Sequence, residues 1–254
     1  MSRLSARLLG SFPQELTIRV RGPDVRRLAS LAGADEEAPL PDLGPLFAEA
    51  ARAGLFGGVA VPPWEAVAEQ VRVEMEPELQ RACWSLRLGG IDPGMFRVLW
   101  NVLRARELEE ADLSTTWPAG SAGVAPLELG RLAYPGVYGK LPFQLEVEAP
   151  LRSSKDRSVQ VVFEQPPPEE VVDRVLAALE RWDQLLLLGG YPEDGVEPAR
   201  SGAFPEPPFQ LDEVTVEQAF PELFAADEAA FHAIANHAAA VHHAGVAVAA
   251  VVVR

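Results

Sequence analysis

The clearest pattern in the chain occurs twice: two segments in which apolar and polar residues alternate, followed by one with apolar residues at helical spacing. The first copy covers Val71 to Leu103 and the second covers Leu145 to Leu179. Alternation is typical of a strand with one buried face, and helical spacing is typical of an amphipathic helix. The sequence therefore predicts duplicated β-hairpin–helix units, with internal repeats at about 70–113 and 143–190.

The same alternation predicts which side chains face solvent. Glu74 and Glu76 take polar positions in the first copy, and Glu146 and Glu148 take polar positions in the second. An antiparallel hairpin with one wet face has this pattern. We expect these four glutamates to form an exposed acidic ladder that meets a partner.

Segments in the first half of the chain add a strand and a helix. Glu15 to Arg21 alternates and predicts a strand. Asp42 is a suitable N-cap for a helix that ends near Ala53, with Gly54 in the C′ position.

Three further elements are expected after the second repeat. Leu185 to Leu188 indicates a short buried strand that ends at a glycine pair. Thr215 and Gln218 have the spacing of a capping box, which predicts a helix from about residue 221 to residue 243. Val246 to Val253 has no polar face and predicts a strand buried on both sides.

These elements together predict an α+β fold with an antiparallel or mixed sheet and a buried C-terminal strand. We expect one compact unit over residues 1–254, with a possible break in the loop at 112–142. That loop and the one at 191–208 are rich in proline and glycine, and long loops often carry function. Their aromatic residues either anchor a partner or attach the loops to the core: Trp117, Tyr134, Tyr138 and Tyr191.

Net charge limits the classes of partner. The formal charge is −15, which repels nucleic-acid phosphates and anionic lipid and attracts a basic surface. The apolar stretch Ala238 to Val253 is shorter than the ~20 residues that a membrane span needs. We expect a cytoplasmic protein, and the abundance of arginine, alanine, glycine and proline indicates a bacterial source with GC-rich codons.

No segment has a recognisable catalytic or metal-binding motif. His232, His237, His242 and His243 are the only histidines, and no two are three or four residues apart, the spacing that places ligands on one face of a helix. Only His237 and His242 stay candidates for a general base. Ser121 lacks the strand–turn–helix setting of a nucleophile elbow, and a single cysteine cannot form a disulfide or a zinc cluster. We therefore predict no catalytic residue, no metal and no cofactor.

Two classes of function remain. The first is a non-catalytic acidic interaction protein, such as an inhibitor or immunity-type protein that masks a basic partner protein. The second is an enzyme or small-molecule-binding protein whose pocket is closed by the loops at 112–142 and 191–208. The charge and the missing motifs favour the first class.

Overall fold

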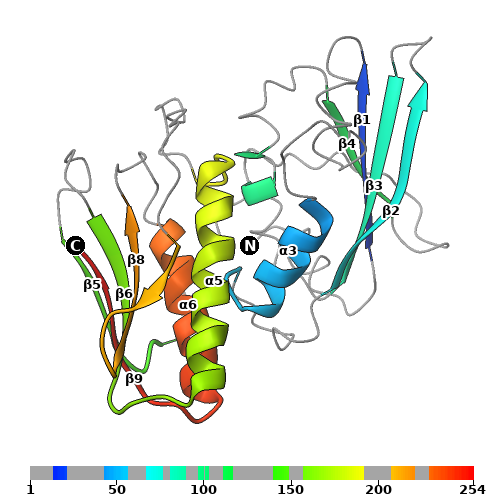
Figure 1. The fold of residues 1–254 in the computed structure, drawn as a ribbon. Helices are drawn as coiled ribbons and strands as arrows, with labels where there is room; N and C mark the ends of the chain where they lie inside the picture. Colours follow the sequence, from blue (N-terminus) through cyan, green and yellow to red (C-terminus); the bar gives the residue numbers. More distant parts are fainter. Residues whose placement is uncertain are drawn as a thin grey trace.

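Two β-sheets lie on opposite sides of a group of helices (Figure 1). This arrangement confirms the predicted α+β class. The computed structural model describes residues 14–21, 43–56, 67–76, 81–89, 97–99, 101–102, 111–116, 140–148, 157–191, 207–220 and 229–254.

The first sheet is antiparallel and comes from the first part of the chain. Its strands are β1 (Gln14–Arg21), β2 (Val67–Glu76), β3 (Arg81–Gly89) and β4 (Ala111–Thr116), in the order β2-β3-β1-β4. The hairpin expected in the first repeat is confirmed, because β2 pairs antiparallel with β3. The strand expected at Glu15 to Arg21 is β1, which pairs with both β3 and β4.

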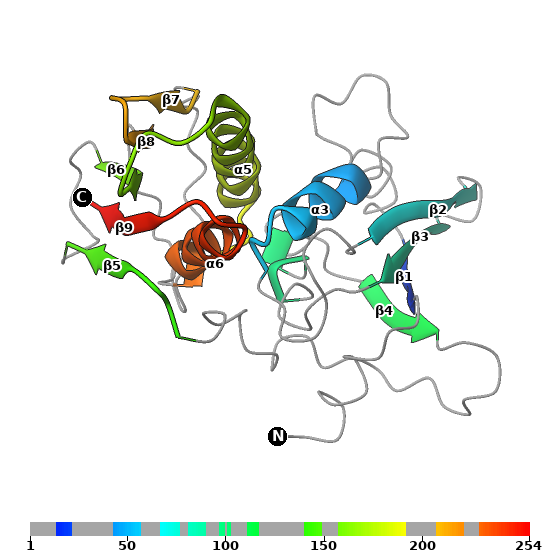
Figure 2. The ribbon, with the colours of Figure 1, turned by 90° about the horizontal axis from the view of Figure 1, so that it is seen from below.

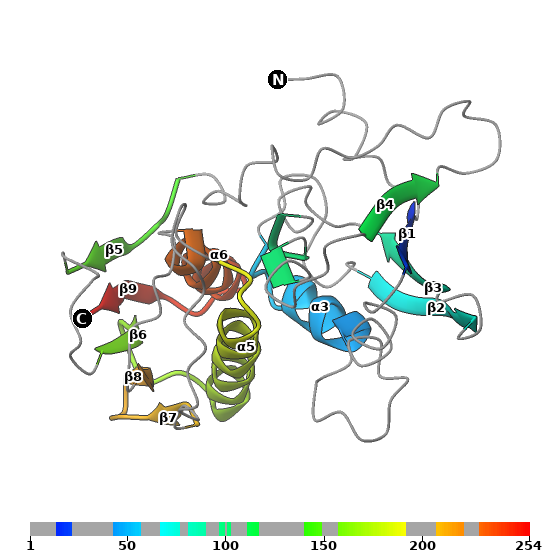
Figure 3. The same cartoon turned by 90° about the horizontal axis from the view of Figure 1, so that it is seen from above.

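The second sheet is mixed and has five strands. They are β5 (Gln144–Val147), β6 (Arg157–Phe163), β7 (Phe209–Gln210), β8 (Thr215–Phe220) and β9 (Val248–Val253), in the order β5-β9-β6-β8-β7. Strand β9 pairs parallel with β5 and antiparallel with β6, and Figures 2 and 3 show it between them.

The hairpin expected in the second repeat is therefore wrong. Strands β5 and β6 are not neighbours, because β9 separates them. The physical reason is the composition of β9, which has no polar face. Such a strand buries more apolar surface in the middle of a sheet than at its edge. The two predicted repeats share the order of elements along the chain but differ in strand pairing.

The expectation of a buried C-terminal strand is confirmed for its valines, whereas Ala249 and Ala250 are only half-buried and the strand begins at Val248 rather than at Val246. Val251 and Val253 belong to the core and are at most 1% exposed, and Val252 between them is only 8% exposed. Their neighbours across the sheet on β6 are buried too, so the centre of the sheet forms one wall of the core.

Three helices fill the space between the sheets. Helices α5 (Glu169–Leu187) and α6 (Ala229–His243) cover one face of the five-stranded sheet, and α3 (Leu43–Arg52) lies between α5 and the four-stranded sheet (Figure 1). Residues 97–99 and 101–102 are also helical and pack at the end of α5, where the Asn101 side-chain amide donates to the Gly190 carbonyl oxygen at 3.0 Å.

Two expectations about local structure are wrong. Residues 185–187 are the last residues of α5, because a short run of leucines suits a buried helix end as well as a strand. Thr215 and Gln218 lie on strand β8, where both are buried and pair with β6, so they do not cap a helix. The helix that follows is described from Ala229 to His243, and the expected start near residue 221 lies outside the described residues.

Each of the three helices ends in a glycine with positive φ. Gly54, Gly189 and Gly245 have φ values of 82°, 79° and 101°, a region that a side chain disfavours. In α5 the N–H of Gly190 bonds the carbonyl oxygen of Leu185 at 2.8 Å, which is the Schellman arrangement. The expected C′ position of Gly54 is therefore confirmed.

A single cluster of buried apolar residues runs through α3, residues 98–102, α5, α6 and the five-stranded sheet. Trp182 is the largest fully buried side chain, and its indole N–H donates to the Ala230 carbonyl oxygen at 2.7 Å. This bond ties α5 to the first turn of α6. Most of the predicted break at 112–142 lies outside the described residues, so the one-unit organisation stays a prediction.

Replacing Trp182 with phenylalanine should destabilise the fold by about 1–3 kcal/mol. The change leaves the Ala230 carbonyl oxygen without its indole donor and opens a small cavity between α5 and α6. Urea unfolding followed by circular dichroism measures this loss. Trp182→Tyr, which retains more of the volume, should be less destabilising than Trp182→Ala, and the reverse order would contradict the packing described here.

None of the described helices is both long enough and apolar enough to cross a bilayer.

Candidate functional site

The four glutamates of the expected ladder lie on two different edge strands. Glu74 and Glu76 belong to β2, at one edge of the four-stranded sheet, and Glu146 and Glu148 border the opposite sheet at β5. Glu146 and Glu148 are exposed, as the alternation predicts, whereas the side chains of β2 lie outside the description. The structure therefore places these glutamates on two separate edge strands rather than on one continuous ladder.

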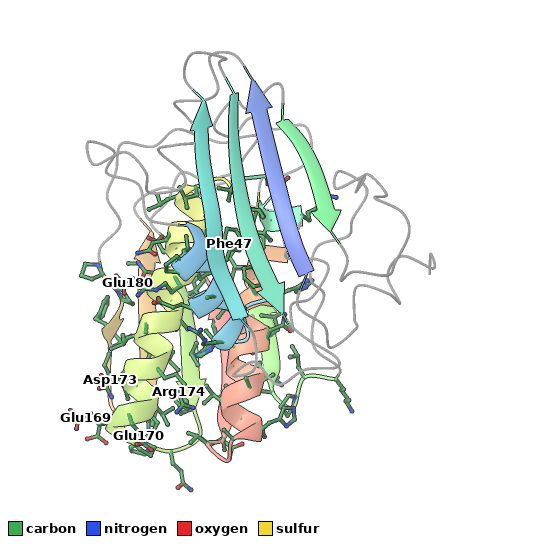
Figure 4. All side chains as sticks on the ribbon, turned by 90° about the vertical axis from the view of Figure 1, so that its right-hand side faces the viewer. Phe47, Glu169, Glu170, Asp173, Arg174 and Glu180 are labelled. Carbon is green, nitrogen blue, oxygen red and sulfur yellow. The ribbon has the colours of Figure 1, made fainter. Side chains whose placement is uncertain are left out.

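A second group of exposed carboxylates lies on α5. Figure 4 shows Glu169, Glu170, Asp173 and Glu180 along the side of the helix that faces away from α6. Glu169 and Glu170 occupy the first turn, where the helix dipole favours negative charge. Arg181, near the other end of α5, forms ion pairs with Glu49 of α3 and with Glu180. It therefore pairs with carboxylates other than those of the first turn.

Of the four aromatic residues expected to meet a partner, the structure describes Tyr191. Tyr191 directly follows the glycine pair at the end of α5, and its side chain is 2% exposed and part of the core. In this conformation it packs the end of α5 instead of facing solvent. Trp117, Tyr134 and Tyr138 lie outside the described residues.

His237 is the most buried histidine of α6, at 1% exposure. Its Nδ1 lies 2.6 Å from the Ala53 carbonyl oxygen, so Nδ1 carries the proton and donates it to the end of α3. The Nε2 atom has no hydrogen-bond partner within the described part of the chain. Burial, together with the positive charge of Arg174, outweighs the Ala53 bond and lowers the pKa of His237 to about 4. The ring is therefore neutral at physiological pH.

His242 has a structural role as well. Its Nδ1 accepts the backbone N–H of Val248 at 3.2 Å, which joins the last turn of α6 to the start of β9. Its ring also lies 6.4 Å from the ring of Phe143, just before β5. Within the described residues, the hydrogen bonds of His237 and His242 are to backbone atoms and not to a carboxylate.

Asp183 is a buried acid that sequence reasoning did not identify. It lies on α5 at 6% exposure, and burial, with a smaller effect from Glu180, raises its pKa to about 7. The signal was present in the sequence, because Asp183 continues the apolar row through Val175 and Leu179 at helical spacing. Such a raised pKa is common in functional sites and also in buried structural acids.

Asp183 and His237 do not form an acid–base pair. Arg174, the charge that lowers the pKa of His237, is nine positions before Asp183 on α5, which is ~14 Å along a helix. General acid–base catalysis needs two groups within hydrogen-bond reach of one substrate. The buried carboxyl and the buried imidazole therefore lie at different places along α5 and do not share one site.

Metal binding finds no support in the described segments. They hold no group of three or more histidine, cysteine, aspartate or glutamate side chains placed around one point. Absence of a metal, a cofactor and a catalytic residue stays a prediction for the whole chain.

Comparison with protein-family models, with curated proteins and with solved structures finds no match to this chain, so its function has to be argued from its own residues.

Proposed function

We propose that this chain is a non-catalytic acidic protein that binds a basic partner protein and masks its surface, as inhibitors and immunity-type proteins do. One observation carries the proposal: among the described residues, exposed carboxylates lie at the β5 edge and along the outer side of α5. Each predicted repeat contributes one acidic edge strand, β2 in the first and β5 in the second.

Charge explains how such a protein recognises its partner. A formal charge of −15 accelerates encounter with a basic surface and keeps acidic proteins and nucleic acids away. Exposed charges are screened beyond ~8 Å at physiological salt, so this steering weakens as salt rises. The buried histidine and aspartate serve packing in this proposal, because neither lies at an exposed acidic surface.

The proposal predicts that a basic protein captured from the native cell associates with the purified chain at a strongly salt-dependent rate. Raising salt from low to physiological concentration should slow association ~10-fold or more and change dissociation less. Surface plasmon resonance separates the two rates. Salt-independent association would contradict the proposal.

Pairwise charge reversal then locates the surface. Glu74→Lys with Glu76→Lys tests the β2 edge, and Glu146→Lys with Glu148→Lys tests the β5 edge. The matched control is Tyr134→Ala with Tyr138→Ala, which leaves the charge unchanged. Tyr191 is omitted because it is buried in the core. If the tyrosine changes abolish binding and neither reversal weakens it, recognition lies in the loops and the proposal is wrong.

A further inference from the structure

Among the described strands, β5 is paired along one side and not along the other. Its only partner in the described residues is β9, and Figures 2 and 3 show β5 as the outermost strand of its sheet. The N–H of Glu148 donates to the Val253 carbonyl oxygen at 2.9 Å, so the backbone N–H and C=O of this residue face β9. Because successive residues of a strand point their backbone groups to opposite sides, those of Leu145 and Val147 face away from β9.

The side chains of β5 differ on its two faces. Leu145 and Val147 are half-buried and pack against the core on the helix side, whereas Gln144, Glu146 and Glu148 are exposed on the other side. A strand added beside β5 would cover the open flanks of the two apolar residues. It would also place its own alternate side chains next to Glu146.

We propose that β5 binds an extended segment of the basic partner as an additional strand, with lysine or arginine at alternate positions and apolar residues between them. This inference rests on the proposed function and adds its binding mode and the chemistry of the partner. Main-chain hydrogen bonds to Leu145 and Val147 contribute affinity, and the alternate side chains decide which segments bind.

Charge argues against the other occupant, a second copy of this chain. Two β5 strands that pair antiparallel about Glu146 bring glutamates from both copies onto the same face. Like charges placed opposite each other on neighbouring strands destabilise the pair, and charged residues on edge strands commonly prevent self-association. The same carboxylates attract a basic strand.

The test measures binding of a short synthetic peptide of alternating lysine and valine to the full chain by fluorescence anisotropy. We expect this peptide to bind, and a peptide of the same composition with its lysines grouped at one end to bind more weakly. Hydrogen exchange should show slower exchange of the Leu145 and Val147 amides in the complex. The alternating peptide with methylated backbone nitrogens retains its charge and should lose affinity, because it cannot complete the ladder.

Two protein variants test the backbone contact directly. Val147→Pro removes an N–H that faces away from β9 and should weaken peptide binding about tenfold, the value of one hydrogen bond. Val147→Ala is the matched control, because it shortens the side chain and retains the N–H, and it should bind nearly as wild type.

The possible results separate this inference from the proposed function. If Glu146→Lys weakens peptide binding while Val147→Pro and methylation do not, the acidic surface stands and strand addition is wrong. If no peptide binds, or an alternating glutamate–valine peptide binds equally well, strand addition by a basic segment is wrong. A dimer in sedimentation that Val147→Pro dissociates would assign the edge to a second copy and also overturn it.

Discussion

A chain that lacks residues 246–254 is expected to lose cooperative folding. These residues supply β9, the strand between β5 and β6, and four of its valines are buried: Val248, Val251, Val252 and Val253. Burying one valine contributes about 1.5–3 kcal/mol, so the four contribute about 6–12 kcal/mol, comparable to the ~5–15 kcal/mol stability of a typical domain. Thermal unfolding followed by circular dichroism should show no sharp transition.

The matched control for this truncation is Arg254→Ala. The Arg254 side chain is exposed, while its backbone N–H bonds the Ser158 carbonyl oxygen at 3.0 Å and is retained in the variant. This variant should unfold cooperatively near the wild-type temperature. Cooperative unfolding of the truncated chain at that same temperature would refute the central position of β9.

Replacing Asp183 with asparagine should raise the free energy of unfolding at neutral pH by about 4 kcal/mol. Burial raises the pKa of Asp183 from its ordinary value of 3.8 to about 7. Between these values the folded chain holds a proton that the unfolded chain has released, so the stability of the wild type falls as pH rises from about 4 to 7. At about 1.4 kcal/mol per pKa unit the total is about 4 kcal/mol, and it vanishes near pH 4.

His237 contributes a pH dependence of the opposite sign. Its pKa falls from 6.5 to about 4 on burial, so below 6.5 the unfolded chain takes up a proton that the folded chain excludes. Stability from this group is complete above pH 6.5 and declines by about 3 kcal/mol as pH falls to 4. In the wild type the two slopes nearly cancel over that range.

Urea unfolding across pH 4 to 7.5 separates the two groups. In Asp183→Asn the histidine slope is no longer offset by the aspartate, so the free energy of unfolding of the variant minus that of the wild type should grow as pH rises from about 4 to 7. The control is Asp173→Asn, an exposed aspartate on the same helix, which should retain the pH profile of the wild type. A difference between Asp183→Asn and the wild type that does not change with pH would show that this carboxyl is not held neutral by burial.

Local pattern predicted most strands and the pairing of β2 with β3, but not the pairing of the strands in the second sheet. Alternation located β1, β2 and β3, and the run of valines located β9. Pairing depends on burial summed over distant segments, which is why β9 between β5 and β6 was not anticipated. The run at 185–188 failed for another reason, because four consecutive leucines carry no period that separates a helix end from a strand.

The candidate site residues also divide into those whose exposure follows from local pattern and those whose burial depends on distant segments. Exposure of Glu146 and Glu148 followed from alternation alone, because the two faces of a strand are determined locally. Burial of Tyr191 did not, because it depends on how the α5 terminus packs against Val98 and Asn101. Burial of His237 reflects a helix that is apolar on nearly every face and covered by its neighbours on several sides.

The parallel pairing of β5 with β9 has a consequence for how fast the chain folds. Gln144 pairs with Ala250, roughly a hundred residues later, and contacts between such distant residues slow folding. Until β9 arrives, β5 and β6 each present an unpaired edge toward the gap that β9 will fill. Unpaired edges in a slow-forming sheet favour aggregation. We therefore expect the refolding yield to fall strongly as protein concentration rises. Low temperature or a chaperone should raise this yield and have less effect on the protein once it is folded.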